Sequence, residues 1–263
     1  MLNYKNKFIF IAGPCVIEDK KLTLDIASYL KEIFLPSSIL FIFKASFDKA
    51  NRTSLKSFRG LGLAKGIKIL EEVKKKLKVP ILSDIHCQHQ IQYVKDVLDI
   101  IQIPAFLCRQ TDLILAVAKT KKIINIKKGQ FLSPDDVKYI VEKIEATGNK
   151  NIFLTERGSC FGYNNLVVDF RSFLIMKKLG YPVIYDVTHS LQKPSAKDGI
   201  SGGDSEFIEP LALAAVAAGV DGLFMEVHPK PKLALSDKHT SYTLARLKFL
   251  VKKIMQIREV TSG

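Results

Sequence analysis

Residues 8–15 read FIFIAGPC, a run of apolar side chains that ends in Gly13, Pro14 and Cys15. A short continuous apolar run, without polar alternation, predicts a β-strand that is covered on both faces. The same pattern occurs seven more times, and the eight predicted strands are residues 8–12, 40–44, 80–83, 100–103, 123–127, 152–155, 183–186 and 222–227.

The stretches between these runs have helical periodicity, for example over residues 66–77 and 211–218. Eight strand–helix units in a chain of 263 residues match a (β/α)8 TIM barrel in number and in length. A doubly wound open sheet has the same alternation and is the alternative architecture. Because no long Pro-, Gly- or Ser-rich linker interrupts the pattern, residues 1–263 are predicted to form a single (β/α)8-barrel catalytic domain.

The chain is basic, with 40 Lys and Arg against 26 Asp and Glu and a formal net charge of +14. Such a charge suits small anionic ligands, and it would also suit nucleic acid or an anionic membrane surface. Most of the basic residues are lysines scattered over predicted helices, as in residues 74–78. We therefore expect small phosphorylated partners and neither nucleic acid nor membrane.

The chain has four cysteines, and no run approaches the roughly 20 apolar residues that cross a bilayer. The cysteines show neither CxxC pairing nor the density of a secreted disulfide scaffold. This usage predicts a reducing, cytoplasmic setting.

Polar and reactive residues follow the predicted strands. Catalytic groups of a barrel come from the carboxyl ends of its strands and from the loops that follow. Five cations occur there, namely Lys44, Lys49, Arg52, Lys127 and Arg157. This set suits two phosphate-bearing substrates, although one or two of the five could simply solvate the rim.

A second set of strand-end residues offers a thiolate, an imidazole and two carboxylates: Cys15, His189, Glu226 and Asp237. Such a mixed set is plausible for Zn²⁺, Fe²⁺ or Mn²⁺ with an open coordination position. The four residues have no short ligand spacing, and a lone cysteine after a strand is more often a small buried apolar residue.

Several long strings resemble the 3-deoxy-D-manno-octulosonate 8-phosphate (KDO-8-phosphate) synthases. They are GPCVIE at 13–18, FKASFDKANR at 43–52, IPAFLCRQTD at 103–112 and NIKK at 125–128. Shorter matches are ERG at 156–158, FGYNNL at 161–166, DVTHS at 186–190 and LSD at 235–237. The resemblance runs from about residue 8 to the end, in the expected order.

The resemblance implies a transferase that condenses phosphoenolpyruvate with D-arabinose 5-phosphate and water, releasing inorganic phosphate, in lipopolysaccharide biosynthesis. The residues that it implies as catalytic are Lys49, Lys127, Arg157, His189 and Asp237. Those that it implies as substrate contacts are Lys44, Lys49, Asn51, Arg52, Thr53, Asp84, Gln102, Pro104, Phe106, Lys127 and Arg157. The sister synthases that use erythrose 4-phosphate have a different loop after the second strand, and they are the nearest rival.

Cys15 matches the metal-dependent class of this family, because the metal-free class has Asn at that position. The resemblance thus implies a divalent ion (Zn, Fe, Mn or Co) bound by Cys15, His189, Glu226 and Asp237, and it also implies a homotetramer.

The polar, Gly-rich residues 193–204 are expected to form a mobile, irregular loop over the active site. Asp204 and Ser205 stand where similar enzymes have a basic residue, which puts phosphate affinity or loop closure in question. Because every other expected contact type is present, a catalytically silent barrel is disfavoured.

Overall fold

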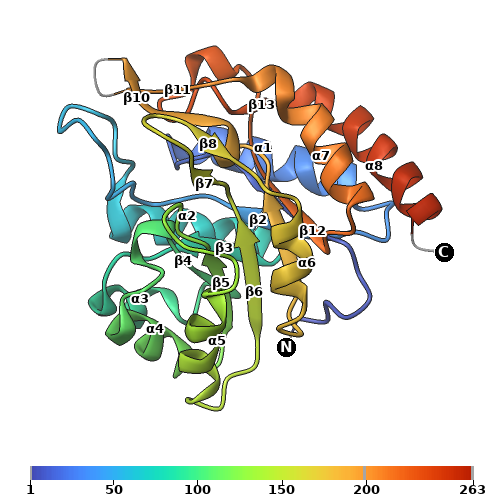
Figure 1. Cartoon of the computed structure of the whole chain (residues 1–263). Helices are drawn as coiled ribbons and strands as arrows, with labels where there is room; N and C mark the ends of the chain where they lie inside the picture. Colours follow the sequence, from blue (N-terminus) through green and yellow to red (C-terminus); the bar gives the residue numbers. More distant parts are fainter. Residues whose placement is uncertain (1, 198–199, 262–263) are drawn as a thin grey trace.

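Eight parallel strands close into a barrel in the computed structural model, which describes residues 2–197 and 200–261 (Figure 1). The barrel strands are β1 (Ile9–Gly13), β2 (Leu40–Lys44), β3 (Ile81–Asp84), β4 (Ile100–Ile103), β5 (Ile123–Lys127), β6 (Ile152–Glu156), β9 (Val183–Asp186) and β12 (Gly222–His228). Each strand pairs with the next, and β12 pairs back with β1. This closure confirms the predicted barrel and excludes the open sheet, and each strand lies within one residue of its predicted bounds.

Helices surround the barrel (Figure 1). They are α1 (Lys20–Phe34), α2 (Gly62–Leu77), α3 (Ile91–Val94), α4 (Thr111–Ala118), α5 (Val137–Glu145), α6 (Arg171–Lys177), α7 (Ile208–Ala217) and α8 (Leu247–Thr261). Helix α1 begins where the carboxylate of Asp19 accepts a hydrogen bond from Leu22 N at 2.8 Å, which satisfies a free backbone donor. None of the described helices is long and apolar enough to span a membrane.

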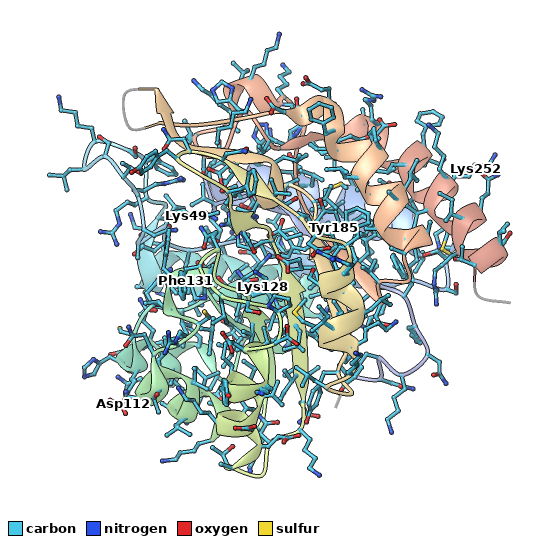
Figure 2. All side chains as sticks on the ribbon, viewed as in Figure 1. Lys49, Asp112, Lys128, Phe131, Tyr185 and Lys252 are labelled. Atoms are coloured by element: carbon cyan, nitrogen blue, oxygen red, sulfur yellow. The ribbon has the colours of Figure 1, made fainter. Side chains whose placement is uncertain are left out.

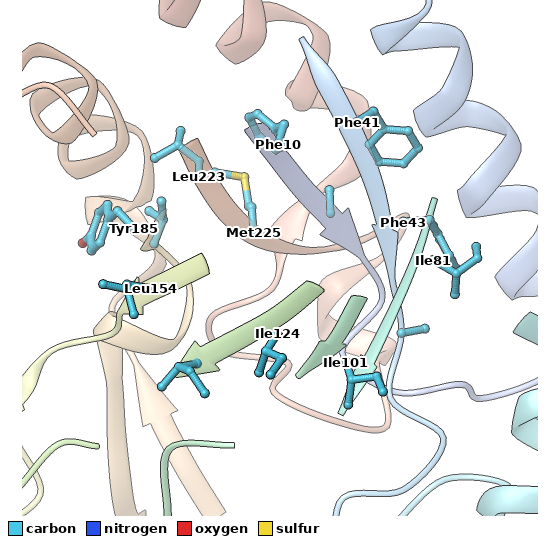
Figure 3. Packing of buried hydrophobic residues seen from close by; sticks show 14 of the residues in the cluster. Phe10, Phe41, Phe43, Ile81, Ile101, Ile124, Leu154, Tyr185, Leu223 and Met225 are labelled. Atoms are coloured by element: carbon cyan, nitrogen blue, oxygen red, sulfur yellow. The ribbon is translucent and has the colours of Figure 1, made fainter. Parts of the chain in front are cut away.

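Alternate side chains of each strand face either the helices or the barrel interior, as the period of a strand requires. Figure 3 shows part of the outer set, in which Phe10, Phe43 and Leu154 belong to the large core cluster between strands and helices. The inner set is a separate apolar cluster that fills the barrel: Ile9, Ile11, Ile42, Leu82, Ile100, Ile123, Phe153, Ile184 and Phe224.

Two residues further toward the carboxyl end of most strands, the barrel interior changes from apolar to polar. On seven strands the next inward residues are Lys44, Asp84, Gln102, Asn125, Thr155, Asp186 and Glu226. All seven are buried, so they require partners. Asn125 donates to Gln102 Oε1 at 2.8 Å and accepts from Thr155 Oγ1 at 2.6 Å, for example. A polar layer therefore lies over the apolar interior at the carboxyl end of the barrel.

Short elements lie beside the barrel. Strand β13 (Tyr242–Thr243) pairs with β12, and β7 (Ser159–Cys160) pairs with β8 (Leu166–Val167). The 3-10 helices are η1 (Gln88–Gln90), η2 (Ala105–Leu107), η3 (His189–Leu191), η4 (Ser205–Phe207), η5 (Pro231–Leu233) and η6 (Leu244–Arg246).

The stretch 193–204 was wrongly expected to be irregular, because most of it forms an antiparallel hairpin. Strand β10 (Gln192–Lys197) pairs with β11 (Ile200–Gly203), and residues 198 and 199 lie outside the described residues. At the base of the hairpin a Cβ on Gly203 would lie 2.1 Å from Thr240 Cγ2. The hairpin can approach the segment after β12 this closely because residue 203 is glycine.

Candidate active site

A cavity of about 830 Å³ opens at the carboxyl ends of the strands. All eleven side chains predicted to contact substrate line it: Lys44, Lys49, Asn51, Arg52, Thr53, Asp84, Gln102, Pro104, Phe106, Lys127 and Arg157. Figure 2 shows Lys49 among the side chains gathered at this end. The fold therefore brings the predicted set together, while the role of each residue stays a prediction.

A second hollow of about 740 Å³ lies outside the barrel and is lined by residues of η1, α3 and α4 and by Lys95 and Lys119, which follow α3 and α4. Its side chains come from helical segments rather than from strand ends. The buried ionisable groups of the barrel interior lie in the first cavity, which is consequently the candidate active site.

Strand β1 leads to Cys15, which contacts the cavity-lining residues Ser236 and Asp237, and β1 approaches β2 closely at this point. A Cβ on Gly13 would lie 1.9 Å from Lys44 O, so only glycine lets the two backbones pass at this point. Lys44 in turn donates from Nζ to Cys15 O at 3.0 Å. The Gly-Pro-Cys turn and the first cation of the site are thereby fixed relative to each other.

Buried carboxylates partner the cations of the cavity. Lys44 Nζ lies 2.9 Å and Lys49 Nζ 3.5 Å from Glu226 Oε1. Arg52 Nη1 lies 3.4 Å from Asp237 Oδ1. These contacts hold the cations in place, and an anionic substrate would meet charged groups that are already oriented.

Arg157 is held differently, because its Nη2 donates to His189 O at 3.2 Å and to Gln192 Oε1 at 2.9 Å. Gln192 begins the β10–β11 hairpin. The guanidinium therefore links the end of β6 to the base of that hairpin.

Lys127 has a pKa well below that of an ordinary lysine. Burial lowers the pKa of Lys127 to about 8, and the neighbouring charges of Lys44 and Arg157 act in the same direction. An ion pair with Asp186 opposes this shift. Lys127 is thus a buried ammonium that loses its proton at a lower pH than an ordinary lysine does.

The four predicted metal ligands also lie close together, and two of them, His189 and Asp237, line the cavity. Cys15, Glu226 and Asp237 offer ligand atoms that all lie within 4.8 Å of one another. His189 Nε2 lies 3.4 Å from Glu226 Oε1 and 3.6 Å from Asp237 Oδ2. Sequence positions more than 200 residues apart are thus brought to one point by the closure of β12 onto β1.

The chemistry of this donor set fits a divalent cation. Glu226 Oε2 is buried and has no hydrogen-bond partner among the described residues, which leaves an acceptor free for an ion. Burial raises the pKa of the Cys15 thiol well above its ordinary value, and Asp237 and Glu226 raise it further. A nearby cation would offset that cost, because metal binding lowers the pKa of a coordinating thiol.

Asp186 and Ser236 contact the predicted residues but were not themselves predicted. The carboxylate of Asp186 accepts from His189 Nδ1 at 2.8 Å, from His189 N at 2.9 Å and from Lys127 Nζ. Ser236 Oγ lies 2.6 Å from Cys15 Sγ and accepts from Arg52 Nη2. Asp186 could have been found from its place at the end of β9. Ser236 follows no strand directly, although it stands in the LSD string at 235–237.

Asp204 has a partner in the structure. Lys193 Nζ lies 2.7 Å from Asp204 Oδ1, and both side chains are partly exposed. The acidic residue at this unusual position is therefore neutralised within the hairpin itself.

Comparison with known proteins agrees with the geometry. The model of the DAHP synthetase I family matches residues 4–262. A protein of Geobacter sp. (strain M21) named 2-dehydro-3-deoxyphosphooctonate aldolase is 56% identical over 252 residues, which cover 96% of this chain and 92% of the relative. Proteins of the same name from Trichlorobacter lovleyi and Desulfatibacillum aliphaticivorans are 54% and 53% identical over 96% and 97% of this chain, and over 93% of each relative.

Proposed function

The chain belongs to the DAHP synthetase I family, and from that premise we propose that it is a KDO-8-phosphate synthase. It condenses phosphoenolpyruvate with D-arabinose 5-phosphate and water, giving 3-deoxy-D-manno-octulosonate 8-phosphate and inorganic phosphate. The name 2-dehydro-3-deoxyphosphooctonate, which the relatives share, describes this eight-carbon phosphorylated product. The product belongs to lipopolysaccharide biosynthesis.

One observation supports this function above the others: five cations, each held by hydrogen bonds or ion pairs, surround a single cavity. Both substrates are phosphorylated anions, and C3 of the enol phosphate must be brought against the aldehyde carbon. The new carbon–carbon bond forms there, water adds at C2, and the bond from C2 to the phosphate oxygen breaks. Positioning and charge neutralisation are the main requirements of this reaction.

Residues at different depths of the cavity bind the two different substrates. Lys49, Lys127 and Arg157, which are buried, bind phosphoenolpyruvate, with Lys44 and Gln102 beside it. The loop after β2 holds the sugar phosphate through Asn51, Arg52 and Thr53, which line the outer part of the cavity and are more exposed.

His189 and Asp237 handle protons at the reacting centre. Asp186 accepts the hydrogen bond from His189 Nδ1 and thereby leaves Nε2 facing Glu226 and Asp237. Deprotonation of the incoming water needs a proton acceptor at this end of the cavity. Burial raises the pKa of the Asp237 carboxyl, but the hydrogen bond with His189 and the charge of Lys49 outweigh it, so the group is ionised and can accept a hydrogen bond from that water.

Cys15, His189, Glu226 and Asp237 hold a divalent ion of the Zn, Fe, Mn or Co type. The free acceptor of Glu226 and the convergence of the four side chains support this assignment. When bound, such an ion supplies Lewis acidity toward a carbonyl or water oxygen.

A steady-state assay of phosphate release tests the function. Phosphoenolpyruvate with arabinose 5-phosphate should give turnover, whereas erythrose 4-phosphate should give little. Lys127→Ala should abolish activity, whereas Lys75→Ala, at an exposed ion pair with Glu71 on α2, should not change it. A preference for erythrose 4-phosphate, or no turnover with either sugar, would overturn the proposal.

The enzyme acts as a homotetramer in the cytoplasm. Several aromatic side chains at the cavity end are exposed, including Phe106 (54%), Phe161 (71%) and Tyr163 (100%), and such a group of residues is typical of a surface between subunits. All four cysteines are free, as a reducing compartment favours. Light scattering after size-exclusion chromatography measures the subunit number.

A further inference from the structure

The ring of Phe224 lies next to two lysines that line the cavity, Lys127 and Lys44. It is fully buried on β12, in the apolar cluster that fills the barrel. Lys127 Nζ lies 3.1 Å from the ring centroid, and Lys44 Nζ lies 5.5 Å from it. The His189 ring is 5.7 Å away between centroids. Three groups from three other strand ends thus converge on one aromatic side chain.

An aromatic face attracts a cation because the ring quadrupole is negative above and below its plane. This attraction is largest where water is excluded, and Lys127 is only 4% exposed. Unlike a carboxylate, the ring has no net charge, so it does not repel an incoming phosphate or carboxylate. An aliphatic side chain would fill the same space, as it does at most positions of the cluster, but it would not stabilise an ammonium.

We propose that Phe224 is a positioning residue for substrate binding: its ring is a neutral platform that holds the Lys127 and Lys44 ammonium groups against the anionic end of phosphoenolpyruvate. The platform compensates part of the loss of water around Lys127 and takes up none of its N–H donors, so those that Asp186 does not accept can donate to substrate. This inference rests on the proposed function.

Replacement of Phe224 by mono-, di- and trifluorophenylalanine tests the platform, since fluorine weakens the ring quadrupole stepwise while nearly preserving ring shape. The affinity for phosphoenolpyruvate, measured by calorimetry, and kcat/KM should both fall with each fluorine. A total fall of about tenfold is expected for a desolvated cation–π contact.

Phe153 provides the matched control, because it belongs to the same buried cluster but packs edge-on against Tyr4, with centroids 5.0 Å apart. The same fluorinated series at residue 153 should leave phosphoenolpyruvate affinity constant. If the series at 224 also leaves affinity and kcat/KM constant, the platform is wrong.

The calorimetric readout separates this inference from the proposed function. An unmodified enzyme that binds phosphoenolpyruvate but does not turn over with arabinose 5-phosphate contradicts the function alone. In that case, the dependence of phosphoenolpyruvate affinity on fluorination still shows whether Phe224 has the proposed positioning role.

Discussion

Replacing Asp186 by Asn should disable two groups of the active site at once. The Asp186 carboxylate is fully buried, and one of its oxygens accepts from both Lys127 Nζ and His189 Nδ1, the latter at 2.8 Å. The other oxygen accepts from His189 N at 2.9 Å. An Asn amide can keep the backbone contact, but its NH₂ group then faces an ammonium and an imidazole N–H.

The size of the effect follows from these contacts. To relieve the clash of donors, His189 must leave Nδ1 without a proton and carry it on Nε2, so that Nε2 can no longer act as a ligand to a cation. Loss of such a supporting carboxylate costs about 10–100-fold in metal affinity or activity. Removing the partner of a buried ammonium costs about 3–5 kcal/mol of stability. We therefore expect kcat/KM to fall by a factor on the order of 100 or more.

Three measurements check this prediction: Mn²⁺ affinity by calorimetry, kcat/KM by phosphate release, and the free energy of unfolding in urea. Asp221→Asn is the matched control. Its carboxylate lies near the opposite end of β9, where it accepts from Val183 N at 2.8 Å and pairs with Lys177, and it is partly exposed. If Asp186→Asn keeps wild-type metal affinity and turnover, the reasoning is refuted.

Three further outcomes are expected. Cys15→Ala should abolish chelator-sensitive activity and weaken Mn²⁺ binding in a metal titration, and full activity after this change would contradict the ligand assignment. Because Lys127 is mainly charged below its pKa of about 8, kcat/KM for phosphoenolpyruvate should fall about tenfold per pH unit above that value. Lys127→Arg should remove this decline if the variant keeps activity. A flat wild-type profile to about pH 10 would contradict this prediction. Gly203→Ala should destabilise the protein by about 1–3 kcal/mol in urea unfolding, because its Cβ would lie 2.1 Å from Thr240 Cγ2; unchanged stability would show that the close approach does not exist.

The barrel strands were predictable because their signal is local. A strand covered on both faces needs consecutive apolar residues, and residues 100–103 and 123–127 match β4 and β5 at both ends. The hairpin β10–β11 was missed because backbone pairing between residues such as Gln192 and Gly203 depends little on side-chain polarity.

The membership of the site was also largely predictable, because strand ends meet at one face of a barrel. Which of these residues contact one another was not predictable. Glu226 contacts Lys44 and Lys49, whereas Asp186 contacts Lys127 and His189, and these choices depend on strand register and side-chain conformation. Asp186 was left out of the predicted site although it points inward, like Glu226, two residues after an apolar residue of the interior.

The two-residue step from the apolar interior to the polar layer means that the register of each strand decides which side chain faces the cavity. Ile184 precedes Asp186 by two positions, and Phe224 precedes Glu226 by two. Inserting or deleting one residue inside such a strand would turn the carboxylate toward the helices and bring an apolar neighbour into the cavity. Loops that carry no site residue can therefore change length during evolution without altering the set of active-site side chains, whereas strands can diverge only by substitution.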